Sequence, residues 1–185
     1  MNALDELGRL QSLFSSPEKL IERAEHVAHG LVPEPYHRLL VHEHHMTVTM
    51  ENFHGTPVTV QVLHAGFNDD GVYHRKILLR RADNGRVVQF GLVRFDFSYV
   101  TSQVKEEIVA GKTPLGRILI NHNVLRHIDL GPVLRIIPGD ELCEYFQCAA
   151  GTPTYGRLAT IFCNSKPAVD LLEVSAPVST VVGWA

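Results

Sequence analysis

The residues most suited to chemistry are charged side chains that interrupt an apolar pattern. The first is Arg75, which shares one side of an alternating segment with Tyr73, Ile77 and Leu79. Side chains two positions apart in a strand lie on the same face, so this alternation predicts that Arg75 points inward. A planar guanidinium can hold a carboxylate through two parallel hydrogen bonds. Arg75 is therefore a candidate for binding an anionic substrate.

The second candidate is Glu173, which shares a strand face with Val169 and Leu171. A carboxyl group buried without a partner resists ionisation, and a raised pKa is what a general acid needs. Arg75 and Glu173 are expected to face one cavity, where the arginine holds the substrate and the glutamate handles a proton. Two alternatives stay open: the two residues form a structural ion pair, or the register is shifted by one and both face solvent. Arg157 is a third candidate, for which a surface position is equally compatible with the sequence.

The run His42–His45, with the sequence His-Glu-His-His, could in principle hold a metal ion. In a strand, His42 and His44 would share one face. Partner ligands at the spacing of known metal sites are missing, however, and a polar segment leading into a strand explains the run equally well. The chain has an odd number of cysteines and no Cys-x-x-Cys pair: Cys143, Cys148 and Cys163. We expect buried thiols, no disulfide and no metal.

The composition excludes several classes of protein. The 185 residues include 17 Lys and Arg against 20 Asp and Glu, so no basic excess is available for a nucleic acid partner. No apolar run approaches the ~20 residues of a membrane span, and the first ten residues are acidic where a signal peptide would be basic. We expect a soluble cytoplasmic protein with a small-molecule partner.

The elements that position these side chains begin with two expected helices in residues 1–40. Apolar residues at three- and four-residue steps predict the first helix: Leu4, Leu7, Leu10 and Phe14. The second is predicted to begin at Ser16 and Pro17 and to end at Gly30. Its acidic side chains argue against a role in DNA recognition.

After residue 45 the apolar period changes to two, which predicts strands at 46–50, 58–62, 72–81 and 86–97. Helices are predicted after Thr101-Ser102, ending at Gly111, and after Thr113-Pro114. Further strands are predicted at 133–137, 142–146, 155–163 and 168–174. Tight turns such as Asp83-Asn84-Gly85 indicate antiparallel neighbours. The sequence therefore predicts an α+β fold, a mostly antiparallel β-sheet with helices packed around it, in one domain spanning residues 1–185.

Three segments resemble chorismate pyruvate-lyase: HRKILLRRADNG at 74–85, GKTPLGRIL at 111–119 and YGRLATIFCNSKPAVDLLEV at 155–174. The resemblance covers roughly residues 40 to 177, and GKTPLGR is its most specific part. The upstream segment HHMTVTMENFHG is more similar to the uncharacterised branch of the same superfamily.

The resemblance implies a lyase that converts chorismate to pyruvate and 4-hydroxybenzoate, a precursor for ubiquinone or plastoquinone biosynthesis, without metal or cofactor. It implies that Arg75 binds the ligand carboxylate and that the backbone N–H of Leu115 contacts it. Glu173 matches the active-site glutamate, and Met46 matches a residue whose backbone lines the pocket. Catalysis would then rest on Glu173 and Arg75, and substrate binding on Arg75, Leu115 and Met46.

The sequence also departs from the lyases. They carry a second arginine in the fourth strand, where this chain has Gly91-Leu92-Val93 and an arginine only at Arg94. An alternative is therefore a non-catalytic binding protein or sensor for a small aromatic carboxylate, as in the effector-binding domains of regulators in the same superfamily. A third possibility is an enzyme that acts on another carboxylated ring. The oligomeric state is not determined by the sequence.

Overall fold

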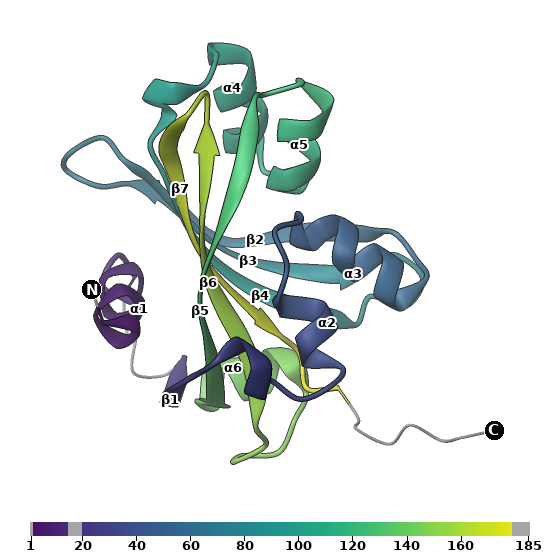
Figure 1. Ribbon diagram of the computed structural model, residues 1–185. Helices are drawn as coiled ribbons and strands as arrows, with labels where there is room; N and C mark the ends of the chain where they lie inside the picture. Colours follow the sequence, from purple (N-terminus) through teal and green to yellow (C-terminus); the bar gives the residue numbers. More distant parts are fainter. Residues whose placement is uncertain (1, 15–19, 179–185) are drawn as a thin grey trace.

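The computed structural model describes residues 2–14 and 20–178, which form a seven-stranded antiparallel sheet with helices on both faces (Figure 1). The strand order is β1-β5-β6-β7-β4-β3-β2. The strands are β1 (Ile21–Val27), β2 (Val58–Phe67), β3 (Tyr73–Arg81), β4 (Val87–Phe95), β5 (Arg126–Pro138), β6 (Thr154–Cys163) and β7 (Lys166–Ser175). The helices are α1 (Ala3–Gln11), α2 (Tyr36–Leu40), α3 (Met46–His54), α4 (Ser102–Ala110), α5 (Leu115–Asn121) and α6 (Asp140–Phe146), with short 3-10 turns at His29–Leu31 and Phe97–Tyr99. The predicted α+β class and antiparallel sheet are confirmed.

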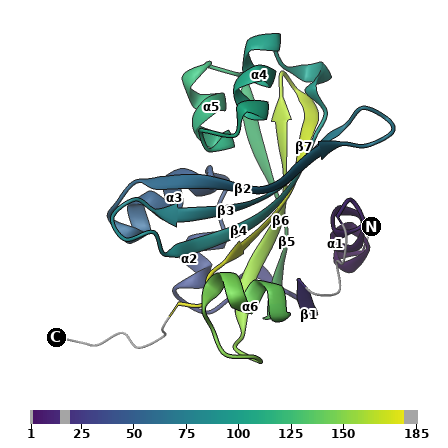
Figure 2. The same cartoon turned by 180° about the vertical axis from the view of Figure 1, so that it is seen from behind.

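The helices divide between the two faces of the sheet (Figures 1 and 2). Helices α2, α3, α4 and α5 pack on the face that carries Ile77 and Val93. Helices α1 and α6 pack on the opposite face, which carries Leu78 and Phe90. Successive strand residues point to opposite faces, so the alternation along β3 sends Ile77 to one layer and Leu78 to the other. Arg75 lies on the same face as Ile77, beneath α3, α4 and α5.

Several predicted turns and caps hold this face in place. The hairpin between β3 and β4 turns at Gly85, whose φ of 72° suits glycine. Helix α4 begins where the Thr101 side chain accepts a hydrogen bond from the N–H of Val104, and it ends at Gly111, whose φ is 66°. Helix α5 follows Pro114, and no side chain caps its start. The cap expected from Thr113 is therefore not formed.

The predicted second N-terminal helix is wrong, because residues Ile21–Val27 form strand β1. This strand pairs antiparallel with β5, with Ala24 opposite Ile136. Pairing with β5 supplies the backbone hydrogen bonds that hold this segment as a strand. The spacing of its apolar residues, which also fits a helix, does not show whether such a partner strand is present. The proposed helix start at Ser16 and Pro17 lies outside the described residues. The long β5 also begins earlier than predicted, at Arg126.

Two predicted strands are helices. Residues 46–50 belong to α3, in which Met46 and Met50 lie four positions apart and are both buried. Residues 142–146 belong to α6, in which Leu142 and Phe146 have the same spacing and are also buried. Over five residues, apolar positions at i and i+4 fit both a helix and a strand face, and packing against the sheet decides the outcome.

None of the described helices is long and apolar enough to span a membrane. The cysteines are free, as predicted, but only Cys163 is fully buried, whereas Cys143 and Cys148 are partly exposed.

Candidate functional site

A cavity of about 50 Å³ lies between the sheet and the first residues of helices α3 and α5. Its floor is formed by inward-facing residues of β3, β4 and β7, including Arg75, Gly91 and Glu173. Met46 and Leu115 line it from the starts of α3 and α5. The structure thus brings together the four residues to which the resemblance assigns roles: Arg75, Glu173, Leu115 and Met46. Their chemical roles stay predictions.

Arg75 is buried, with 1% of its surface exposed, which confirms that it points inward. Its Nη1 donates a hydrogen bond of 3.3 Å to the carbonyl of Ile108. Its Nε has no hydrogen-bond partner among the residues described, and no carboxylate there forms an ion pair with it. Burial lowers the pKa of the Arg75 guanidinium from its ordinary value. A buried cation without a counter-ion is costly, and an anionic ligand would offset that cost.

Glu173 does not pair with Arg75. Its Oε2 accepts a hydrogen bond of 2.8 Å from Nε of Arg157, which lies directly opposite it on β6. Arg157 is completely buried, so a surface position for this residue is excluded. The structural ion pair considered as an alternative therefore exists, but with Arg157 in place of Arg75. In this arrangement the Glu173 carboxylate acts as a hydrogen-bond acceptor.

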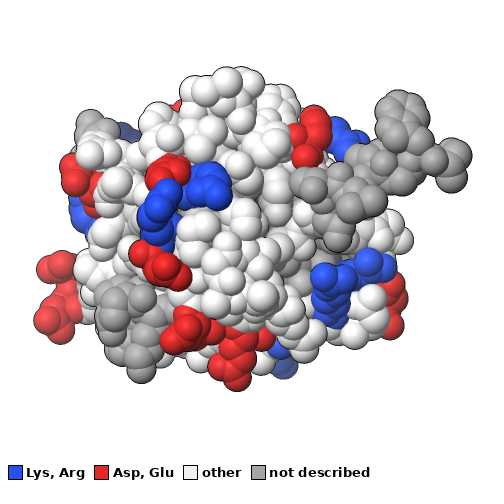
Figure 3. Space-filling model, turned by 90° about the horizontal axis from the view of Figure 1, so that it is seen from below, with Lys and Arg blue, Asp and Glu red and all other residues white. Residues whose placement is uncertain are grey.

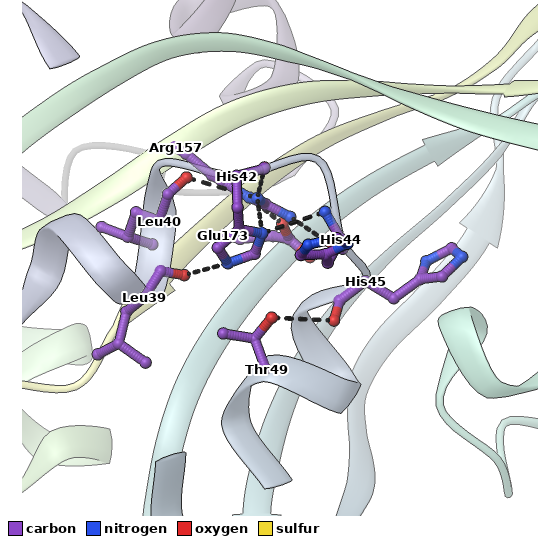
Figure 4. Close-up of polar contacts among 8 residues, drawn as sticks. All are labelled: Leu39, Leu40, His42, His44, His45, Thr49, Arg157 and Glu173. Carbon is purple, nitrogen blue, oxygen red and sulfur yellow. Dashed lines mark hydrogen bonds and ion pairs between the residues drawn. The ribbon is translucent and has the colours of Figure 1, made fainter. Parts of the chain in front are cut away.

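Arg157 also holds the segment His42–His45 against the sheet (Figure 4). Its Nη1 donates to the carbonyl of His42 at 2.7 Å, and its Nη2 donates to the carbonyl of His44 at 3.0 Å. A longer bond of 3.4 Å reaches the carbonyl of Leu40. One buried guanidinium thus joins Glu173 on β7 to the loop that enters α3. From the sequence Arg157 was a candidate in a strand whose two faces are both mixed, and its partners follow only from the strand register.

The histidines of this segment are fixed by the same contacts. His42 stacks on His44, with 5.5 Å between ring centroids, and its Nε2 lies 2.8 Å from the carbonyl of Leu39. Burial and the charge of Arg157 lower the pKa of His42 to about 4. Within residues 2–14 and 20–178, no group of three or more side chains is placed to hold a metal ion. The run leads into helix α3 and not into a strand.

His45 points away from the other histidines and lines the cavity (Figure 4). Its Nε2 accepts a hydrogen bond of 2.8 Å from Nε of Arg126. Burial and this positive charge lower the pKa of His45 to about 4. A Cβ atom at Gly116 would lie 3.0 Å from the His45 ring, so the glycine of the GKTPLGR segment makes room for this histidine.

Gln89, a polar residue on the floor of the cavity, was not predicted from the sequence. Only 2% of Gln89 is exposed, and its Oε1 has no hydrogen-bond partner in the described part of the chain. The signal was present, because Gln89, Gly91 and Val93 alternate on the inward face of β4.

Comparisons with known proteins identify the fold. No protein-family model matches the chain, and no curated protein matches its sequence. One similar solved structure is the ligand-binding domain of a regulator assigned to the GntR family, from Bordetella bronchiseptica. It has a TM-score of 0.50 and 11% identity, over 64% of this chain and 85% of that chain. A second is PhnF from Mycobacterium smegmatis, with a TM-score of 0.50 and 10% identity, over 71% of this chain and 63% of that chain.

The fold is the chorismate lyase-like fold. The GntR ligand-binding domains share it, and at these identities the likeness concerns the fold alone. The resemblance to the lyases stated from the sequence therefore holds for the architecture.

Proposed function

We propose that this chain is a binding domain for a small aromatic carboxylate, whose carboxylate group is held by Arg75. The observation that carries the proposal is a buried guanidinium that lines a cavity and has no carboxylate partner among the described residues. Arginine binds planar carboxylates through paired hydrogen bonds. The apolar side chains of Val60, Ile77 and Leu171 line the same cavity and suit a ring.

The structural neighbours support binding without chemistry. The Bordetella bronchiseptica structure is described as a ligand-binding domain of a transcriptional regulator. The position of Glu173 agrees with this role, because its carboxylate accepts a hydrogen bond from Arg157 and that arginine also binds the His42–His45 segment. Glu173 therefore has a positioning role that requires no reaction.

The size of the cavity sets a condition on binding. A volume of about 50 Å³ holds only a few water molecules, whereas a cavity of roughly 150 Å³ is needed to hold benzene. Part of the wall must therefore move when a benzoate enters. His45, Met46 and Thr47 belong to the wall and follow the segment that Arg157 holds by its carbonyl groups. We expect displacement of this segment on binding.

The test is a calorimetric titration of benzoate and 4-hydroxybenzoate into the protein and into Arg75→Met. A charged hydrogen bond contributes about 1.5–3 kcal/mol, so the variant should bind roughly 10- to 100-fold more weakly. Lys105→Met is a matched control, because it removes a cation of the same domain that does not line the cavity. Equal binding by the protein and Arg75→Met would remove Arg75 from the site, and absence of binding would refute the proposal.

Chorismate pyruvate-lyase activity is a second candidate. It is favoured by one observation: Arg75, Leu115, Glu173 and Met46, which match the lyase residues, all line one cavity. The test is incubation with chorismate and chromatography of 4-hydroxybenzoate and pyruvate. General acid catalysis by Glu173 predicts that Glu173→Gln lowers turnover about 10²- to 10⁴-fold while ligand binding persists. Binding of hydroxybenzoates without turnover of chorismate would leave the binding domain as the function.

A further inference from the structure

Two cysteines meet at the C-terminal end of helix α6, which lies near the bottom of Figure 2. Gln147 has a left-handed conformation there, with φ of 53°, and its N–H donates to the carbonyl of Glu144 at 3.3 Å. The N–H of Cys148 donates to the carbonyl of Cys143 at 3.1 Å. These two hydrogen bonds define a Schellman motif, in which the side chains of the two outer residues commonly touch. Both outer residues of this motif are cysteines.

The backbone places Cys143 and Cys148 within reach of a disulfide bond. The hydrogen bond of 3.1 Å joins the Cys143 carbonyl oxygen to the Cys148 nitrogen. These atoms lie about 2.4 Å and about 1.5 Å from their own Cα atoms, so the two Cα atoms are at most about 7 Å apart, within the range that a disulfide can bridge. Sγ of Cys143 lies 3.9 Å from the carbonyl oxygen of Ala149, so this thiol points to the segment that carries Cys148.

The surroundings of the three thiols differ. Cys143 and Cys148 are free and partly exposed, whereas Cys163 is fully buried. Cys163 ends β6, nine residues from Thr154 at the end of the strand near α6, so roughly 30 Å of strand separates it from the other two. Burial and the neighbouring Cys148 thiol raise the pKa of the Cys143 thiol to about 11. Because the thiolate is the nucleophile, the first attack in an exchange reaction falls to Cys148.

We propose that Cys143 and Cys148 are a reversible redox pair, which a low-molecular-weight disulfide such as glutathione disulfide converts to an intramolecular disulfide bond. The Cys148 sulfur attacks one sulfur of the reagent, breaks its S–S bond and releases one molecule of thiol. The Cys143 sulfur then attacks the Cys148 sulfur of this mixed disulfide and releases the second thiol. The two cysteines lose two hydrogens and two electrons, and the reagent gains both. A reducing dithiol reverses the reaction.

The bond would close the end of the helix while its backbone hydrogen bonds stay in place. Helix α6 is fixed to the back of β3, because Glu141 forms an ion pair of 2.8 Å with Lys76 and accepts a hydrogen bond from the Tyr145 hydroxyl. Closing the loop from Cys143 to Cys148 restricts the unfolded chain, so oxidation should raise Tm by roughly 4–9 °C. The pair thus links the redox state of the surroundings to the stability of the domain.

The experiment is incubation of the folded protein with excess glutathione disulfide, followed by mass spectrometry and thiol titration. We expect a mass lower by two hydrogens and loss of two of the three thiols, both reversed by a reducing dithiol. Proteolytic cleavage after Tyr145 should leave two peptides that only the Cys143–Cys148 bond joins. Cys163→Ser is the matched control and should lose two hydrogens as the unaltered protein does, whereas Cys148→Ser should not.

Several results would overturn the inference. Three thiols that survive the incubation show that the pair does not react, and glutathione retained on the unaltered protein shows that the second thiol does not reach the first. A bond to Cys163, or between two chains, identifies a different reaction. A lower Tm after oxidation shows that the folded turn does not accept the bond. Should Cys148→Ser not fold, the peptide map of the unaltered protein decides alone. These outcomes are independent of Arg75 and its cavity.

Discussion

Arg75 and Arg157 are both fully buried arginines, and the structure predicts that their replacement by methionine has opposite effects on stability. Arg75 has 1% of its surface exposed, donates a hydrogen bond of 3.3 Å to the carbonyl of Ile108, and lies beside the neutral Tyr73 side chain, which partly opposes the effect of burial on its pKa. The Ile108 carbonyl also accepts from the N–H of Gly111, so it stays paired when the guanidinium is removed. The lost bond is worth about 1 kcal/mol, whereas burying an ion without a counter-ion costs several kcal/mol. Arg75→Met should therefore raise the free energy of unfolding by about 1–3 kcal/mol.

Arg157 differs because its charge has partners. Replacing it leaves the Glu173 carboxylate without its cation and removes the donors that bind the carbonyls of Leu40, His42 and His44. Breaking a buried ion pair by removing one partner typically costs 3–5 kcal/mol. Arg157→Met should lower the free energy of unfolding by about that amount.

Urea denaturation and thermal unfolding without ligand measure both changes. For a domain of this size, 1 kcal/mol shifts Tm by about 2–4 °C, so Arg75→Met should gain roughly 2–10 °C and Arg157→Met should lose more than about 6 °C. A ligand at 100 times the Kd of the unaltered protein should add about 2.7 kcal/mol to that protein, and about 0.4–1.4 kcal/mol to Arg75→Met if the variant binds 10- to 100-fold more weakly. If Arg75→Met is instead destabilised by more than about 1 kcal/mol, Arg75 is a structural residue and the case for a carboxylate site on it fails.

Two further predictions concern pH and metal. The pKa values of His42 and His45 are lowered to about 4 in the folded protein from an ordinary value of 6.5, so their contribution to stability is complete above pH 6.5 and is lost as pH falls toward 4. Allowing for their partial exposure, the loss should be about 1–2 kcal/mol for each histidine, measured by denaturation at pH 7 and 4.5. His45→Asn should reduce this pH dependence, and a curve identical to that of the unaltered protein would contradict the assignment. Ligand binding and Tm should be unchanged after exhaustive chelation, because the described residues contain no group of three potential metal ligands. Loss of binding that zinc restores would show that a metal is required.

The inward face of the sheet could be predicted from sequence because its signal is repeated. In β3 one face is mostly apolar and the other mostly polar, which marks Arg75 as inward, whereas in β7 both faces are largely apolar and Glu173 stands out only as a charge among aliphatic residues. Arg75 and Glu173 were located in this way. The short segments 46–50 and 142–146 were assigned to strands and are helices, because over five residues the two periods are not distinguishable.

Edge strand β1 shows a different limit. Its apolar residues fit a helical spacing, but the free edge of β5 offers a continuous row of backbone partners to Ile21–Val27. Whether a segment pairs with an edge depends on where the chain brings it in three dimensions, and local periodicity does not contain that information. The preceding residues 15–19, where the helix was expected to begin, are outside the described structure.

The roles of the two buried arginines show why site residues could be located from sequence more readily than their partners. Arg75 and Arg157 both have apolar residues on their own face of the strand, such as Ile77 beside Arg75 and Ala159 beside Arg157, so the local pattern around each is similar. What separates them is the register: Arg157 stands opposite Glu173 on the neighbouring strand, whereas Arg75 stands opposite Val93 and Ala65. Register is set by turns and bulges at the ends of the strands, and a shift of one residue would exchange the faces. The neutral neighbours of Arg75 leave its charge for a ligand, and the acidic neighbour of Arg157 commits that charge to the fold.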